Sequence, residues 1–465
     1  VREIACPGTE NVWSLYEDSA GRVWIAQTRG GLRLVQPDGG IRSFHKGYGL
    51  TYDAVRFAFE DREGSIWIGT SGGGLLRYRE PRFVSYGEAD GLPDRVVRSV
   101  SVAGPDRLLV ATYGGGPVQL LQERVTSLPG IPPPPLPQAL RFAQAILEDR
   151  AGQVWIGTAD GLWRIPPGGV AEAVPPTLWG GSSAYALFED RAGTVWIGTD
   201  RGLARYADGA FGVLSAADGL PAGSVHGLAE DPKRPLLWIA VRGAGLACWE
   251  DGRARLVAGS SSPPIDRIAS VYVDAAGTVW AGTLDSGLVG YRDGRVSSIG
   301  PSTGSLPRSI NGIAEDGAGF LWLASNRGVV RVALAELYDI LEGRRILATF
   351  ARFDTTDGLA SMECAGSVTP AVARDLQGNL WFATLKGLSR IRPADLRLRT
   401  NPPPVRIESV TLDGQPIPEA QWRGGDGGPL QIAPHNRRLE VRYTALELSA
   451  AEDTRFSYSV NGDDD

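Results

Sequence analysis

Nine short turns in this sequence each place a polar or charged residue shortly after a recurring Trp-Ile-Gly-Thr phrase or its equivalent. In chain order these residues are Arg29, Ser71, Tyr113, Asp160, Arg201, Arg242, Asp285, Arg327 and Lys386. Five of the nine are cationic and two are acidic, on a chain whose formal net charge is −6. Guanidinium and ammonium groups bind anions through charge-assisted hydrogen bonds. If these turns share one face, the bias predicts a site for an anionic ligand such as an acidic sugar, with Tyr113 as a stacking surface. Charged, solvated loop tips are the competing interpretation.

Acid–base catalysis is the other chemistry that this set of turns allows. Asp160 and Asp200 follow neighbouring phrases, and two carboxylates about 5 to 9 Å apart can hydrolyse a glycosidic bond. No His-rich metal motif accompanies them, and the three cysteines, Cys6, Cys248 and Cys364, show no metal-binding or disulfide spacing. We therefore expect a protein that is not an enzyme and has no catalytic residues, no metal and no cofactor, with its cysteines as small apolar core residues.

The phrase belongs to an internal repeat. Its tryptophan slot is filled by Trp24, Trp67, Val110, Trp155, Trp196, Trp238, Trp280, Trp322 and Trp381. Successive slots are 41 to 45 residues apart, except for a last interval of 59. That period, with short β-branched and aromatic runs between glycines, is typical of a β-propeller whose blades have four strands. In the unit at 187–206, for example, we expect strands at 186–189, 194–199 and 203–206.

Each repeated residue type has a mechanical explanation within such a blade. The Asp-x-x-Gly spacing suits a tight hairpin, because Asp accepts from nearby amides and Gly adopts positive φ. The tryptophan can bury about 150 to 250 Å² against the next blade. The glycine after it lets backbones approach near the crowded axis. These repeats therefore predict a scaffold.

Nine units leave the ring count open. We expect one closed ring of nine blades over 1–400, in which a strand at the N-terminus completes the last blade and removes the exposed edges. A ring of seven blades, with two units left over from a preceding ring, is the alternative.

Three segments depart from the repeat. Residues 131–138 (IPPPPLPQ) read as a stiff polyproline spacer. Residues 334–345 place apolar side chains at helical spacing, which predicts a short amphipathic helix on the ring and explains the long interval. Residues 401–465 begin with a Pro-rich linker and then alternate apolar and polar residues, as in a truncated antiparallel β-sandwich.

Charge and hydropathy limit the partners. A pI near 5.4 without a basic patch argues against nucleic acid. No apolar run approaches the roughly 18 residues that a membrane span needs, and the N-terminal residues do not look like a signal peptide.

The unit Glu-Asp-x-x-Gly-x-Val-Trp-Ile-Gly-Thr-x-x-Gly-Leu-x-Arg-Tyr at 189–206 resembles the propeller repeat of two-component regulators. Residues 405–465 are similar to the Tyr-rich sandwich that follows those propellers, with Phe456, Tyr458, Val460, Gly462 and Asp464 in its usual run. The resemblance implies a periplasmic sensor region that binds a small molecule or oligosaccharide and relays it to membrane-anchored signalling domains, in a receptor expected to form homodimers. A protein-interaction propeller is the alternative, and a propeller glycosidase or lyase ranks lower.

Overall fold

The structure is a computed structural model that describes residues 11–47, 49–259, 265–300, 306–396, 404–422 and parts of 430–464. The chain divides into two units, one of residues 81–396 and the other of residues 1–80 together with 397–465. In the part of the chain described, no helix has the length and apolar character needed to cross a bilayer.

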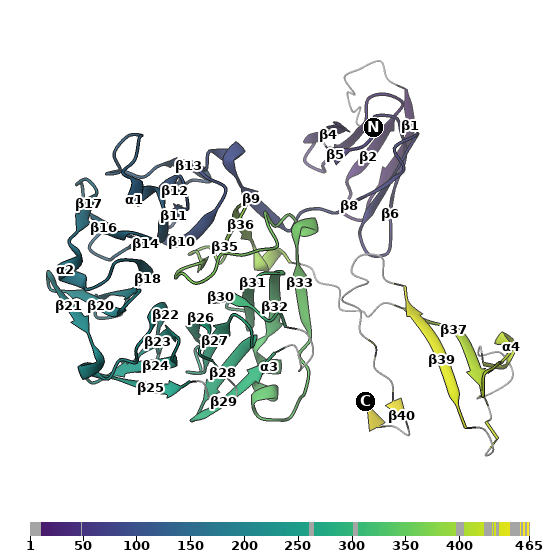
Figure 1. Cartoon of the computed structure of the whole chain (residues 1–465). Helices are drawn as coiled ribbons and strands as arrows, with labels where there is room; N and C mark the ends of the chain where they lie inside the picture. Colours follow the sequence, from purple (N-terminus) through teal and green to yellow (C-terminus); the bar gives the residue numbers. More distant parts are fainter. Residues whose placement is uncertain are drawn as a thin grey trace. The chain divides into compact units, whose positions relative to one another are not determined.

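Residues 81–396 form a ring of seven four-stranded antiparallel sheets, the blades of a β-propeller (Figure 1). Six blades follow chain order from the inner to the outer strand. They are β10 (Val97–Gly104), β11 (Arg107–Thr112), β12 (Gly116–Leu121) and β13 (Arg124–Ser127); β14 (Ala143–Glu148), β15 (Val154–Thr158), β16 (Gly161–Ile165) and β17 (Glu172–Val174); β18 (Ala184–Glu189), β19 (Val195–Thr199), β20 (Gly202–Ala207) and β21 (Ala210–Leu214); β22 (Ser224–Glu230), β23 (Leu237–Arg242), β24 (Gly245–Glu250) and β25 (Arg253–Ala258); β26 (Ile268–Val273), β27 (Val279–Thr283), β28 (Leu288–Arg292) and β29 (Arg295–Ile299); and β30 (Ile310–Glu315), β31 (Phe320–Ser325), β32 (Gly328–Ala333) and β33 (Phe350–Phe353).

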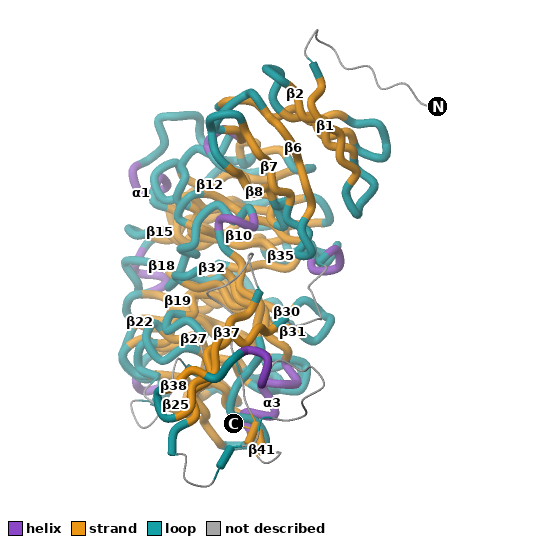
Figure 2. Tube along the Cα trace, turned by 90° about the vertical axis from the view of Figure 1, so that its right-hand side faces the viewer, coloured by secondary structure: helices purple, strands orange, loops and turns teal. Residues whose placement is uncertain are grey.

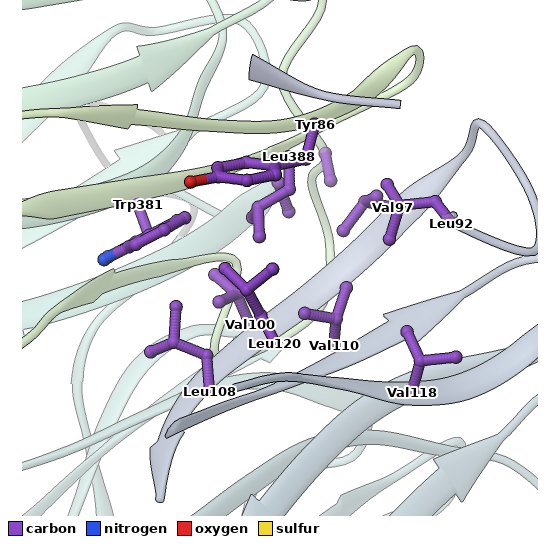
Figure 3. Packing of buried hydrophobic residues seen from close by; sticks show 12 residues of the cluster. Tyr86, Leu92, Val97, Val100, Leu108, Val110, Val118, Leu120, Trp381 and Leu388 are labelled. Carbon is purple, nitrogen blue, oxygen red and sulfur yellow. The ribbon is translucent and has the colours of Figure 1, made fainter. Parts of the chain in front are cut away.

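The seventh blade closes the ring with a strand from its beginning. Its strands β34 (Val372–Arg374), β35 (Leu380–Thr384) and β36 (Gly387–Ile391) are completed by β9 (Phe83–Tyr86), which pairs with β36. Figure 3 shows the resulting seam, where Tyr86, Trp381 and Leu388 pack against apolar residues of β10 and β11. β9 thus closes a ring of seven blades.

The propeller class is confirmed, but the closure into nine blades is wrong. The N-terminal residues 1–10, which we expected to close the ring, lie outside the described residues, and β9 pairs with the edge strand of the last blade. The repeat pattern could not choose between these closures, because every unit offers the same edge to a closing strand. The alternative of seven blades with two units left over agrees with the strand pairing.

The first two repeats form separate sheets in the other unit. They are β1 (Val12–Glu17), β2 (Val23–Gln27), β3 (Leu32–Val35), β4 (Ile41–Lys46) and β5 (Gly49–Leu50), and then β6 (Val55–Glu60), β7 (Ile66–Thr70) and β8 (Leu75–Tyr78). The second sheet has three strands, because the residues in its fourth position are those of β9. Large apolar side chains of β1 and β6, among them Leu15 and Phe59, are exposed.

A recurring aspartate, buried or partly buried, shapes each regular repeat. In the blade of β18, Asp190 accepts from the amide of Thr194 at 2.9 Å and from the indole N–H of Trp196 at 2.7 Å. The same Asp–Trp hydrogen bond recurs in six other repeats, at 2.6 to 3.0 Å. It fails at Trp238, whose indole nitrogen has no partner, because the turn after Asp231 is one residue longer. The predicted hairpin role of the aspartate is confirmed, and the indole bond adds to it.

Adjacent blades are joined by the glutamate that precedes this aspartate and by close backbone packing. Glu189 accepts from the amide of Arg150 in the preceding blade, and Glu230 accepts likewise from Arg191. A Cβ on Gly198 would lie 2.6 Å from the carbonyl oxygen of Val225 in the next blade. The predicted close approach at this glycine is therefore present. The side chain of Trp196 packs in one cluster with residues of β22 and β23, as its role as a packing residue between blades predicts.

Helices are few and short, and strands and loops dominate the view in Figure 2. The predicted amphipathic helix is present as α3 (Leu334–Leu341), which buries Leu334 and Leu337. The other helices among the described residues are α1 (Gln138–Arg141), α2 (Pro176–Trp179), α4 (Glu419–Trp422), η1 (Glu88–Asp90), η2 (Ala216–Asp218), η4 (Thr355–Asp357) and η5 (Pro393–Asp395).

The C-terminal segment contains a small antiparallel sheet. β37 (Val405–Leu412) lies between β38 (Gln415–Pro416) and β39 (Leu439–Ala445), and β40 (Ser459–Val460) pairs with β41 (Asp463–Asp464). The sandwich over 401–465 stays a prediction, because much of its sequence lies outside the described residues.

Candidate functional site

The inner strands of the ring share a β-bulge close to their first residue. In six blades the register between the inner strand and its neighbour shifts by one residue at this point. The bulged residues are Arg98, Gln144, Tyr185, His226, Ala269 and Asn311. A bulge leaves one residue out of the ladder and redirects its side chain, and bulges are frequent beside functional sites. The repeat therefore builds a circle of six non-repeating residues around the ring axis.

A segment of the seventh blade crosses the ring at the level of these bulges. We call residues 364–370 the axial segment. Asn311 donates to the carbonyl of Cys364 at 2.9 Å, and the amide of Val100 donates to the carbonyl of Pro370 at 3.1 Å. Thr369 bonds through its backbone to Tyr185 at 3.0 Å. The axial segment thus contacts inner strands of the blades of β10, β18 and β30, which are not adjacent in the ring, and so crosses its centre.

Two arginines hold the middle of the axial segment. The Nη2 atom of Arg98 donates to the carbonyl of Gly366 at 3.2 Å, and the Nη2 atom of Arg242 donates to the hydroxyl of Ser367. The Nε atom of each arginine is buried and has no hydrogen-bond partner. Burial lowers the pKa of Arg98 and of Arg242, and for Arg242 the positive charge of Arg267 adds to the shift. None of the described carboxylates pairs with either guanidinium.

His226 completes this cluster from the blade of β22. Its Nδ1 atom lies 2.7 Å from the carbonyl oxygen of Ser367, and its Nε2 atom lies 2.8 Å from the hydroxyl of Ser224. Because a carbonyl can only accept, Nδ1 carries the proton and Nε2 accepts from the hydroxyl. The imidazole stacks on the ring of Tyr185, with centroids 4.6 Å apart. The axial site, as we call it, comprises Arg98, Tyr185, His226, Arg242 and the axial segment.

The axial site contains a neutral histidine. Burial lowers the pKa of His226 to about 4, and the charges of Arg242 and Arg98 act in the same direction, against the hydrogen bond to the Ser367 carbonyl. Below the ordinary histidine pKa of 6.5, His226 binds a proton in the unfolded chain that it does not bind in the folded chain. Stability therefore falls on acidification, by about 3 kcal/mol between pH 7 and pH 4.

The variant His226→Gln should lack this part of the pH dependence. Glutamine does not titrate and can still donate to the Ser367 carbonyl. Urea unfolding at pH 7 and pH 4 measures the difference. The wild type should lose about 3 kcal/mol more than the variant over this interval, and equal losses would show that His226 is not held neutral.

Two of the predicted site residues lie at the axial site. Arg242 is one of its arginines, and Tyr113 faces Arg98, with the guanidinium carbon 5.9 Å from the ring centroid. Tyr113 also packs against Phe142 at 5.0 Å while remaining partly exposed. The side chain of Asp285 pairs with Arg267 at 3.1 Å.

The remaining predicted residues do not converge on the axis in the described contacts. Asp160, Arg201, Arg327 and Lys386 are exposed at their turns. Arg29 is exposed as well, but between β2 and β3 of the other unit. The prediction that these residues bind ligand stays untested.

The turns that carry them have a structural cause of their own. The hydroxyl of Thr158 donates to the carbonyl of Gly161 and accepts from the amide of Asp160, and Thr199, Ser325 and Thr384 repeat this pattern. The Thr-x-x-Gly spacing is therefore a turn motif. The motif therefore fixes the position of the residues in these turns whether or not they bind a ligand.

The carboxylate of Asp200 is already hydrogen-bonded to the residues just before β18. It accepts from the amides of Ser182 and Ser183 at 2.8 and 3.1 Å and from the hydroxyl of Ser182 at 2.6 Å. Partial burial opposes ionisation, but these hydrogen bonds hold the pKa of Asp200 below its usual value. A carboxylate held ionised in this way is a poor general acid.

Sequence reasoning missed Arg98, His226 and Ser367. A usable indication exists for the first two, because the residue at the bulge differs among the six blades that have one while the residues around it recur. A position that varies inside an otherwise constant repeat is one whose side chain the scaffold does not determine. Ser367 had no such indication, since the axial segment replaces the start of an ordinary inner strand.

A cavity at the seam between the seventh and first blades lies at the other ends of the strands. It is lined by the turns around Asp106, Glu123 and Gln377. Polar side chains bond across the seam, since Arg390 pairs with Glu123 and the amide of Gln377 donates to Asp106. We therefore regard this cavity as a feature of the junction at which the ring closes.

The axial segment begins with a buried thiol. Burial raises the pKa of Cys364 to about 12, and burial raises the pKa of Cys248 as well. Both cysteines are buried and free, as the sequence predicts, and Cys6 lies outside the described residues.

We expect neither thiol to react with a disulfide reagent in the folded protein at pH 8, because the thiolate is the reactive form. Both should react fully in 6 M guanidinium chloride. Rapid modification of native Cys364, measured by peptide mass, would show that the axial segment opens readily.

The chain is similar to known proteins both in its repeat sequence and in its fold. The family model of the two-component regulator propeller matches residues 7–29 and 179–201. The extracellular domain assigned to the hybrid two-component system BT3049 of B. thetaiotaomicron has a TM-score of 0.68 at 20% identity, covering 95% of this chain and 60% of that one. The extracellular domain of BT4673 from the same organism gives 0.53 at 15% identity, covering 92% and 58%.

No curated protein sequence matches the chain. At these identities the structural likeness shows the fold, and the chain spans about three fifths of the length of the two domains. The chain carries two-component regulator propeller repeats, built into a β-propeller like those in the extracellular domains of hybrid two-component systems.

Proposed function

We propose that this chain is the ligand-binding part of a periplasmic sensory region in a two-component signalling protein. The ligand binds at the axial site, and its presence is relayed through the C-terminal sheet to membrane-anchored signalling domains in a homodimeric receptor. The repeat family and the extracellular domains that share the fold support this assignment.

One observation carries the proposal. Arg98 and Arg242 are partly buried at the ring centre, each with a fully buried Nε, and within the described residues neither has a carboxylate partner. Burying a guanidinium without its counter-ion is unfavourable, and apolar side chains would fill a purely structural core at lower free energy. Uncompensated charge of this kind, at a ring centre built from non-repeating residues, supports a binding site.

The proposal takes the chain as a binding module and not as an enzyme. The carboxylate best placed for acid–base chemistry, Asp200, is saturated by hydrogen bonds from Ser182 and Ser183. Asp160 is exposed at the tip of its turn. This assignment is checked by incubating the chain with oligosaccharide and analysing the products by mass spectrometry.

A thermal-shift screen tests the function. The panel consists of neutral and acidic oligosaccharides, amino acids and small anions. A ligand at 100 times its Kd stabilises the folded state by about 3 kcal/mol, which raises Tm by several degrees. The shift should disappear in Arg242→Gln and persist in Arg253→Gln, which removes an exposed arginine from the outer strand β25 of the same blade. The hit should then alter autophosphorylation of the natural receptor, and a receptor that ignores every hit would contradict the sensory role.

A further inference from the structure

The two arginines of the axial site present the same edge to the axial segment. In both guanidiniums Nη2 bonds to the segment, at the carbonyl of Gly366 for Arg98 and at the hydroxyl of Ser367 for Arg242. In both, the adjacent Nε is buried without a partner. Each Nε–Nη2 edge therefore has an unused donor at Nε beside an Nη2 that donates one of its two N–H groups to a neutral oxygen.

That edge is the one with which arginine binds oxyanions through two parallel N–H···O bonds. A neutral carbonyl or hydroxyl occupies one donor only. The charges at the site are the two guanidiniums, because His226 is neutral and Arg267 is paired with Asp285. A ligand that balances these charges carries two negative charges.

We propose that the axial site binds a compact dianionic oxyanion, a dicarboxylate or a phosphate, which takes the Nε–Nη2 edges of Arg98 and Arg242 from Gly366 and Ser367. This inference rests on the proposed function, because it names the ligand class of the same site. In this proposal the oxyanion replaces the Ser367 hydroxyl as the acceptor at Nη2 of Arg242. Binding and movement of the axial segment are therefore coupled.

The backbone conformation of Ser367 favours that movement of the axial segment. Ser367 has a φ of +62°, in the left-handed region that residues other than glycine adopt at a free-energy cost. Its conformation is held by the contacts of its carbonyl with His226 and of its hydroxyl with Arg242. An oxyanion that removes the second contact removes part of what holds the strained residue.

Isothermal titration of the full chain with malonate and with inorganic phosphate at pH 7.5 tests the inference. Sodium chloride at equal ionic strength is the reference. We expect saturable binding of at least one of the two anions, and the one that binds identifies the source. Arg98→Gln and Arg242→Gln should each weaken binding at least tenfold, since each removes one bidentate pair.

Ser367→Ala separates competition from simple electrostatics. It removes the hydroxyl that competes for Nη2 of Arg242 and leaves both arginines in place, so the anion should bind about fivefold more tightly. Arg242→Lys keeps the charge without the planar edge and should still weaken binding, which decides the matter if the glutamine variants fail to fold. Arg253→Gln, the control on the outer strand β25, should bind as the wild type does.

Two results would overturn the inference. One is that neither anion binds more than chloride does, in the wild type or in Ser367→Ala. The other is binding that survives Arg98→Gln and Arg242→Gln, or Arg242→Lys, unchanged. A neutral ligand that shifts Tm and drives receptor output, without oxyanion binding, would refute the ligand class and leave the sensory function standing.

Discussion

A chain that begins at Pro81 should fold into the complete ring, and a chain that begins at Glu88 should lose about 3 to 6 kcal/mol of stability relative to it. The difference is β9, whose Phe83 and Tyr86 are 2% and 7% exposed. Burying such a side chain contributes about 1.5 to 3 kcal/mol. Without β9 the outer edge of β36 also loses its partner strand. Thermal and urea unfolding of the two chains, with sedimentation to detect association, measures the effect.

Point variants of β9 in the full chain provide the matched control. Phe83→Ala should cost about 3 to 5 kcal/mol, because Phe83 packs against Phe353 and Phe382. Val84→Ala, on the other face of the same strand, is half exposed and should change stability by less than about 1 kcal/mol. If the chains starting at Pro81 and Glu88 were equally stable, β9 would not close the ring.

Replacement of Asp274 by alanine should destabilise the ring by about 3 to 5 kcal/mol. This carboxylate is 1% exposed and accepts four hydrogen bonds. The donors are the amides of Ala276 and Thr278 at 2.9 and 3.0 Å, the indole of Trp280 at 2.8 Å and the hydroxyl of Tyr338 at 2.8 Å. Each buried donor left without an acceptor costs about 1 to 3 kcal/mol, and water entering the gap recovers a part.

The same position of another repeat supplies the control. Asp231 caps its turn through the amides of Lys233 and Arg234 and pairs with the exposed guanidinium of Arg234 at 3.3 Å, but the indole of Trp238 does not bond to it. Asp231→Ala should therefore cost about 1 kcal/mol. Asp274→Asn, which keeps an acceptor for the two amides, should fall between the two alanine variants. Equal losses for Asp274→Ala and Asp231→Ala in urea unfolding would refute the role of the indole and hydroxyl bonds.

Part of the candidate site was predictable from the sequence. Turn residues after the tryptophan phrase were expected to share a face, and Arg242 and Tyr113 do lie at the axial site. Arg98 and His226 were missed because the reasoning followed residues that recur, and the bulge position holds residues that do not. The contact between Ser367 and Arg242 joins residues 125 positions apart, so no local sequence pattern predicts it.

What the sequence determined by itself is the repeating unit. The period, the Asp–Trp and Thr-x-x-Gly spacings and the glycine beside the tryptophan act over a few residues or between adjacent blades, so each copy carries the same instruction. These patterns predict a propeller, its strands and the face on which its turns lie, and the apolar spacing at 334–345 predicts the helix α3.

Only the tertiary structure decided how many blades close and what fills their centre. All repeats present equivalent edges, so local pairing energies cannot select which strand joins β36, and the choice of β9 depends on packing across about 300 residues of chain. The same holds at the axis, where the axial segment meets inner strands that are remote in sequence. The identity of each blade is a local property, whereas closure and the axial site are properties of the whole ring.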